Sequence, residues 1–276
     1  APAAASVHPA GGNRSVVACI DGRGARLSIG IFDFGIYSPL ELVLALVVVC
    51  AAGTVRGFTG FGTGLVMVPL LALMWGPVEA LGTTVILGTI STLQLLPTVI
   101  RRINWREMAP MLTTSVLFSP VGTALLISLD KEIVKKVIAA LVLGVTLITL
   151  RGWKYAGPRG AVPSAVAGAL GGTINGVAGV GGPPMVLYLL SLPDEAETHR
   201  ANIVVALALS SLSVFVSMLV AGVISTRILT HGATFVLPTL ASVSLGAWLF
   251  RRLPAALFKL VVLWFLIAIS LAILLA

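Results

Sequence analysis

Two glycine-rich breaks carry the polar residues whose types and spacing could do chemistry in this chain. The first reads "GTVRGFTGFGTG" from Gly53 to Gly64, and the second reads "GTINGVAGVGGP" from Gly172 to Pro183. At a constant offset the two segments share five of twelve residues, four of them glycine. Arg56 in the first copy corresponds to Asn175 in the second. The later "VGTALLISL" also resembles "LGAWLFRRL". These matches indicate two related halves.

The elements that flank the breaks are long apolar runs. Hydrophobic residues make up 58% of the 276 residues and charged residues 10%, whereas soluble domains carry about 25% charged residues. Runs such as Val78 to Ile100 and Lys259 to Ala276 approach the length of about 20 residues that spans a bilayer. We therefore predict an all-α membrane protein.

Charge and motif content argue against several other classes of protein. The formal net charge is +8, but the cations lie in short loops, where the positive-inside bias explains them better than a nucleic-acid partner does. The two cysteines lack metal-ligand spacing, and no metalloprotease, Walker or Ser/His/Asp pattern occurs. We expect no enzyme activity, no metal, no cofactor and no nucleic-acid partner.

The pattern of runs and loops divides the chain into four regions. Residues 1–37 do not have the charge and hydropathy pattern of a clean signal peptide, and we expect a poorly ordered extension. Residues 38–151 are predicted to form a first transmembrane repeat, 152–162 a cytoplasmic linker, and 163–276 a second repeat. Each repeat is predicted to contain a glycine-broken helical hairpin and three transmembrane helices.

Positively charged loops predict how the repeats are oriented. With "RRINWRE" in the cytoplasm, ten basic residues near the membrane lie inside and four lie outside. Both termini then lie outside, the first repeat enters the membrane from outside, and the second enters from inside. The two repeats are therefore predicted to be inverted relative to each other.

The runs that follow the breaks are too short to span a membrane. Leu65 to Trp75 has eleven residues and Met185 to Leu192 has eight. We expect each broken hairpin to place its glycine apex near the membrane midplane, where irregular backbone must face protein or water. Paired interrupted segments of this kind are the best sequence indication of a transporter's binding site.

Arg56 predicts the charge of the ligand. A charged side chain inside a membrane costs about 2.5–3.5 kcal/mol on insertion scales, and no acidic residue occupies the interior of a predicted segment. The helix starts that follow the breaks would add positive charge. The alternatives are close helix packing through G-x-x-x-G and an arginine that reaches the interface. Two copies at matching breaks favour an anion path.

The run that follows each break adds neutral hydrogen-bond donors. "TISTLQ" corresponds to "ALSSLS", so that Ser91, Thr92 and Gln94 match Ser210, Ser211 and Ser213. Such hydroxyls suit an oxyanion but also join membrane helices. The predicted substrate site consists of residues from both breaks and both runs: Arg56, Gly57, Thr59, Gly60, Gly62, Thr63, Gly64, Ser91, Gln94, Asn175, Gly176, Gly179, Gly181, Gly182, Ser210 and Ser213.

The twin breaks, the charge-poor helices and the "LGAWLFRRLP" segment resemble the sulfite exporter TauE/SafE family, from about Leu40 to the C-terminus. The resemblance implies that sulfite, organosulfonates or similar small sulfur oxyanions cross a bacterial inner membrane. The second break departs from the family pattern at Pro183 and Pro184, where a further glycine is common. Because no carboxylate lies inside the predicted segments, we expect export driven by the membrane potential without obligate proton coupling, with sodium coupling left open.

Three other readings stay open at this point. They are an anion channel of the same fold, a membrane subunit that does not transport, and an intramembrane enzyme, for which the sequence offers no nucleophile. Saturable, slow flux would distinguish a transporter from a channel. The expected partners are the anionic substrate and the lipid bilayer, and a homo-oligomer is compatible with the sequence.

Overall fold

The computed structural model describes residues 17–21, 24–29, 32–33, 38–100, 103–151, 155–250 and 252. Contacts divide the chain into two units, residues 1–42 and 43–276. The first unit contains strands β1 (Val17–Asp21), β2 (Gly24–Ile29) and β3 (Phe32–Asp33), which pair as an antiparallel sheet in that order. These strands lie in the segment for which the sequence pattern predicted an extension and no strands.

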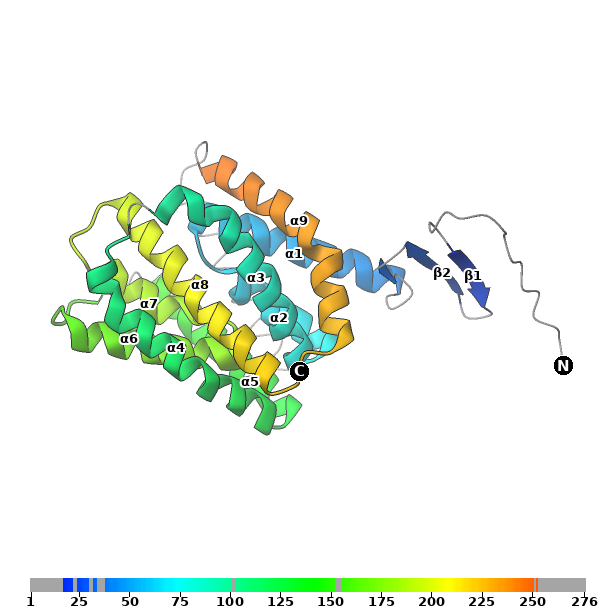
Figure 1. The fold of residues 1–276 in the computed structure, drawn as a ribbon, viewed down its shortest axis with the longest axis horizontal. Coiled ribbons are helices and arrows are strands. Elements are labelled where there is room, and N and C mark those ends of the chain that lie inside the picture. Colours follow the sequence, from blue (N-terminus) through cyan, green and yellow to red (C-terminus); the bar gives the residue numbers. More distant parts are fainter. Residues whose placement is uncertain are drawn as a thin grey trace. The chain divides into compact units, whose positions relative to one another are not determined.

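The described residues from 38 to 250 fold into helices (Figure 1). These helices are α1 (Pro39–Thr59), α2 (Thr63–Trp75), α3 (Pro77–Val99), α4 (Trp105–Ser128), α5 (Lys131–Leu150), α6 (Ala161–Ala178), α7 (Gly182–Leu189), α8 (Ala196–Val220) and α9 (Thr226–Phe250). Among them, six are long and apolar enough to cross a membrane. The prediction of an all-α membrane protein is confirmed for this part of the chain. The apolar run from Lys259 to Ala276 lies outside the described residues.

Several helices begin a few residues before the apolar stretch of sequence that each contains. Apolar stretches of the sequence start at Ala109, Ala201 and Gly232, whereas the helices that contain them, α4, α8 and α9, begin four, five and six residues earlier. The first turns of α4 and α8 hold Glu107 and Glu197, and acidic side chains there interact favourably with the helix dipole. Hydropathy alone therefore misses these polar first turns.

Both glycine breaks interrupt the helices where the sequence predicted. Helix α1 ends at Thr59 and α2 begins at Thr63, with Gly60 at φ 82° and Gly62 at φ 97° between them. Helix α6 is followed by Gly179 at φ 66° before α7 begins. Residues with a Cβ resist this left-handed backbone, so glycine is required at these three positions.

Each half packs its first helix against the other half. Helix α6 lies along α4, and a Cβ added to Gly122 would lie 2.1 Å from the carbonyl oxygen of Thr173. Helix α1 lies along α9 in the same way, since a Cβ added to Gly246 would lie 2.1 Å from the carbonyl oxygen of Thr54. Thr54 and Thr173 correspond by the offset that relates the two breaks, and Gly122 and Gly246 hold the same place in the matching segments "VGTALLISL" and "LGAWLFRRL". The recurrence of this contact supports the duplication. The inverted orientation of the halves stays a prediction.

Helices α3 and α8 pack against each other between these two helix pairs. Helix α3 also contacts α9, and α8 also contacts α4. Both helices carry buried polar side chains, including Thr84 and Thr92 on α3 and Ser210 on α8. The centre of the bundle is therefore polar, and the two breaks lie next to it.

We expect Gly122→Ala and Gly246→Ala to lower the thermal stability of the protein in detergent by similar amounts. In each variant the new methyl group meets a neighbouring backbone that cannot rotate away, and overpacking costs about 1–3 kcal/mol. The effect is measured by heating the purified protein to a series of temperatures and recording, by size-exclusion chromatography, how much of it still elutes as a monodisperse peak.

The control is Gly144→Ala on α5, where a Cβ would meet no atom within 4 Å in the part of the chain that the structure describes. This variant should be neutral or slightly stabilised, because alanine has the higher helix propensity. Equal melting temperatures in all three variants would contradict the close packing of these helices.

Candidate functional site

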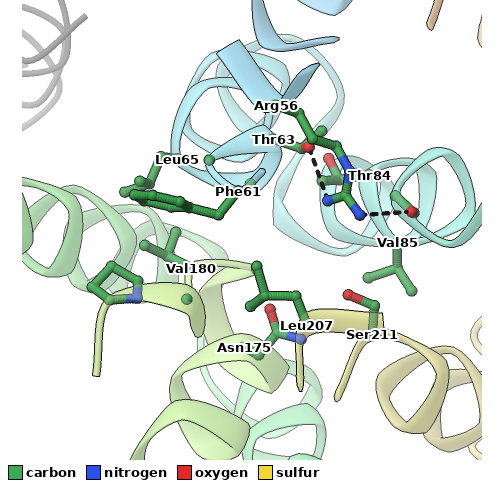
Figure 2. Close-up of a pocket in the computed structure, with 16 residues that line it drawn as sticks. Arg56, Phe61, Thr63, Leu65, Thr84, Val85, Asn175, Val180, Leu207 and Ser211 are labelled. Carbon is green, nitrogen blue, oxygen red and sulfur yellow. Dashed lines mark hydrogen bonds between the residues drawn. The ribbon is translucent and has the colours of Figure 1, made fainter. Parts of the chain in front are cut away.

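A pocket lies where the two glycine breaks meet (Figure 2). The breaks touch through their backbones, because a Cβ on Gly64 would lie 1.7 Å from the carbonyl oxygen of Gly179. Residues of α1, α2, α3, α6, α7 and α8 line the pocket. Seven of the predicted site residues are among them: Arg56, Gly62, Thr63, Gly64, Asn175, Gly179 and Gly182.

Arg56 is buried at the edge of this pocket, with 5% of its surface exposed. Its Nη1 donates to Thr63 Oγ1 over 3.2 Å, and its Nη2 donates to the Gly88 carbonyl over 3.2 Å and to Thr92 Oγ1. Its Nε has no hydrogen-bond partner in the part of the chain that the structure describes. The groups that hold the guanidinium are all neutral, so none of them balances its charge.

Thr84 is a second pocket residue with an unsatisfied polar atom. Its Oγ1 is buried and has no hydrogen-bond partner among the described residues. Leaving a buried polar group without a partner costs about 1–3 kcal/mol. An oxyanion in the pocket could accept hydrogen bonds from the Thr84 hydroxyl and from Arg56 Nε, and it would remove both costs together.

Two helix N-termini open onto the pocket. Thr63 and Gly64 begin α2, and Gly182 and Pro183 begin α7, and all four line the pocket. Such termini carry roughly half a positive charge and present free N–H groups to an anion. Helix α7 offers fewer donors than α2, because its second and third residues are prolines. The half that holds Arg56 is therefore also the half with more backbone donors.

The rest of the pocket wall is largely apolar. Phe61, Leu65, Val180, Pro183 and Leu207 line it, and Figure 2 shows the first three on the side away from the guanidinium. Apolar walls lower the local dielectric constant, which strengthens any interaction between Arg56 and a bound charge. The arrangement suits one small anion that carries an apolar substituent or none.

Asn175 lies across the pocket from Arg56 in Figure 2. Its Nδ2 donates to Ser210 Oγ over 3.0 Å, and its Oδ1 accepts a hydrogen bond from the backbone N–H of Gly181 over 3.4 Å. The side chain is 4% exposed. Asn175 therefore fixes the second break to α8, and Ser210 holds it in place without lining the pocket.

Five predicted residues of the breaks shape the backbone and do not line the pocket. A Cβ on Gly57 would lie 2.0 Å from the Val243 carbonyl oxygen, and one on Gly176 would lie 2.4 Å from that of Ser119. These two glycines allow α1 and α6 to approach their partner helices. The other three, Thr59, Gly60 and Gly181, form the turns between the helices.

The other predicted hydroxyl and amide residues make structural hydrogen bonds. Ser91 donates to the Gly88 carbonyl over 2.9 Å, and Ser213 donates to the Val116 carbonyl over 2.8 Å. Gln94 is exposed and donates to Ser244 Oγ over 2.9 Å. None of the three lines the pocket. Their role as substrate contacts stays a prediction.

The predicted site left out three residues of α3 that surround the guanidinium. Thr84, Gly88 and Thr92 are spaced four residues apart, which places them on one face of the helix. Thr84 and Gly88 line the pocket, and Gly88 and Thr92 hold Arg56. The four-residue spacing of small polar residues opposite the first break was the signal that could have identified them.

We expect Thr84→Val to leave the protein as stable as the parent or more stable, and to reduce sulfite binding. Valine keeps the shape of threonine and removes an unsatisfied hydroxyl whose burial costs about 1–3 kcal/mol. The measurement is the melting temperature with and without added sulfite, because a ligand that binds the folded state raises it.

Thr83→Val is the matched control. Thr83 Oγ1 is also buried without a partner among the described residues, but Thr83 does not line the pocket. This variant should show the same change in stability as Thr84→Val, and sulfite should raise its melting temperature as much as it raises that of the parent. An undiminished shift in Thr84→Val would exclude the hydroxyl as an anion contact.

Comparison with protein-family models matches residues 44–273 to the sulfite exporter TauE/SafE model. Comparisons with curated proteins and with solved structures gave no match. The matched range includes both glycine breaks and every residue of the pocket, in agreement with the resemblance noted from the sequence. The chain therefore belongs to the sulfite exporter TauE/SafE family.

Proposed function

We propose that this protein is a secondary transporter that exports a small sulfur-containing oxyanion, sulfite or an organosulfonate, from the bacterial cytoplasm across the inner membrane. Its family membership supports a membrane transporter of sulfite or related sulfur anions. The observation that carries the proposal is the buried Arg56, whose Nε lacks a partner among the described residues while the group lines a pocket. A bound anion would supply the hydrogen-bond acceptor that Arg56 Nε lacks among the described residues.

The energetics of Arg56 favour an anionic ligand over a purely structural role. An arginine inside a membrane costs about 2.5–3.5 kcal/mol on insertion scales. Thr63, Thr92 and the Gly88 carbonyl offset part of that cost through hydrogen bonds, but they bring no negative charge. An anion would supply the charge, and the N-termini of α2 and α7 would add to its binding.

The proposed direction follows from the membrane potential. A monoanion that leaves the cytoplasm of an inside-negative cell gains about 2.3 kcal/mol per 100 mV. No acidic residue lines the pocket in the described part of the chain. Glu79, which is partly exposed, and the buried His231, whose Oε2 and Nε2 are 3.8 Å apart, also lie outside the pocket. We therefore propose export without obligate proton coupling.

The membrane orientation completes the proposal. Basic residues in the loops support a cytoplasmic location for the loops that follow α3, α5 and α7. Both termini would then lie in the periplasm. The two hairpins would reach the pocket from opposite sides of the membrane, so that a small movement of either could expose the anion to one side at a time.

We expect Arg56→Ala to abolish potential-driven sulfite efflux from proteoliposomes. The substitution removes the buried cation, and a pocket of neutral groups then has to desolvate the anion without compensation. The assay compares initial efflux rates of the parent and the variant under an imposed potential, after both have been shown to elute as folded protein.

The matched control is Arg227→Ala, which removes an exposed cation at the start of α9 and should keep the parental rate. Equal efflux from Arg56→Ala and the parent would make Arg56 a structural anchor. If the parent itself moves no sulfite but moves an organosulfonate, the proposal stands with that substrate.

We also expect the efflux rate to follow the membrane potential and not the proton gradient. At a fixed potential, dissipating the pH difference should leave the rate unchanged, whereas reversing the potential should suppress it. Sulfite efflux is also measured with and without a sodium gradient. This comparison tests whether export is coupled to sodium ions bound by backbone carbonyls. An efflux rate that depends strictly on the proton gradient at a fixed potential would contradict export without proton coupling.

A further inference from the structure

We propose that Gly88 and Leu207, which occupy the same position in the two halves, set the size of the anion that the pocket accepts. The inference rests on the proposed transport function. It assigns a specificity role to two residues outside the predicted site, one of which is the smallest residue and the other a large apolar one. Position 88 leaves room beside the cation, and position 207 limits the room opposite.

Gly88 differs from the glycines that pack helices together. A Cβ on Gly122 would lie 2.1 Å from neighbouring backbone and one on Gly172 would lie 2.4 Å from it, whereas a Cβ on Gly88 would meet no atom of the described residues within 4 Å. Gly88 is nevertheless buried, and it lines the pocket. The open space at its Cβ position is therefore internal space of the pocket and not the surroundings of the protein.

The space at Gly88 lies next to the cation. The Gly88 carbonyl accepts hydrogen bonds from Arg56 Nη2 over 3.2 Å, from Ser91 Oγ over 2.9 Å and from Thr92 Oγ1 over 2.8 Å. This residue is thus fixed to the guanidinium by its backbone while its missing side chain leaves the adjacent space empty. A group bound to the anion's sulfur could occupy that space without displacing Arg56.

Leu207 fills the corresponding position on α8. The offset that relates the two breaks also relates residue 88 to residue 207. Leu207 lines the pocket and is 8% exposed, and Figure 2 shows its side chain directed toward the pocket. A Cβ on Gly182 would lie 3.5 Å from Leu207 Cδ2, so this side chain closes the pocket against the second break. The two halves therefore enclose an asymmetric space.

The physical consequence is a size limit that two substitutions should move in opposite directions. A methyl group at position 88 takes up space that a substituent on the anion would need, but it leaves the bonds of the Gly88 carbonyl in place. Truncation of Leu207 opens space away from Arg56. Neither change alters the charge of the pocket, so the smallest anion should be affected least.

The test measures initial efflux from proteoliposomes for sulfite, methanesulfonate, ethanesulfonate and 1-propanesulfonate. The variants are Gly88→Ala, Leu207→Ala and the control Gly144→Ala. Gly144 is a helical glycine outside the pocket, and a Cβ added there would also meet none of the described residues within 4 Å. The quantity compared is the rate for the largest sulfonate that the parent moves, divided by its rate for sulfite. Elution profiles and melting temperatures establish that each variant is folded.

We expect this ratio to fall at least about tenfold in Gly88→Ala, to rise in Leu207→Ala and to stay within about twofold in Gly144→Ala, since one methyl group in a fitted pocket typically discriminates by tenfold or more. If the parent moves sulfite alone, Leu207→Ala should extend transport to methanesulfonate. If Gly88→Ala fails to fold, the Leu207→Ala ratio decides.

The outcomes separate this inference from the function on which it rests. A parent that moves none of the four anions overturns the proposed function, and the size limit with it. A parent that moves them, with ratios unchanged in both pocket variants, overturns only the roles of Gly88 and Leu207. A fall in the ratio that Gly144→Ala reproduces would attribute the effect to helix rigidity and would also overturn the size limit.

Discussion

A buried guanidinium held by neutral groups is the constraint on which the rest of the structure depends. Arg56 lies at the end of α1, and its three described hydrogen bonds go to Thr63, Gly88 and Thr92. These acceptors come from the two helices that follow α1 in the chain. The first break must therefore turn the chain so that α2 begins beside the arginine, and α3 must present a carbonyl and a hydroxyl to it.

The glycines of the breaks serve this constraint in two different ways. Gly60, Gly62 and Gly179 take left-handed backbone and turn the chain. Gly64 lets the two breaks touch through their backbones, because its missing Cβ would overlap the carbonyl of Gly179. The pocket exists because two irregular segments, far apart in sequence, lie against each other inside the protein, where their free polar groups avoid lipid.

The two halves share a fold but differ in chemistry. The same helix contacts recur at Gly122 and Gly246, yet Arg56 faces Asn175, and Gly88 matches Leu207. The first half supplies the charge and more of the backbone donors, the second half supplies the neutral polar side chains of Asn175 and Ser211, and both halves contribute to the apolar wall. Because the second half carries Asn175 in place of an arginine, Arg56 is spared the repulsion that a second buried cation would add.

The sequence by itself determined the helical class, the positions of both breaks and the family, because hydropathy, glycine content and internal duplication are local or periodic properties of the chain. Only the tertiary structure decided which residues share the pocket. It assigned Gly57 and Gly176 to helix packing, and it placed Thr84 in the pocket. Which face of a helix meets a cavity depends on how neighbouring helices are rotated, and no local pattern specifies that. The short strands near the N-terminus were missed for the same reason, since strand pairing depends on a partner segment.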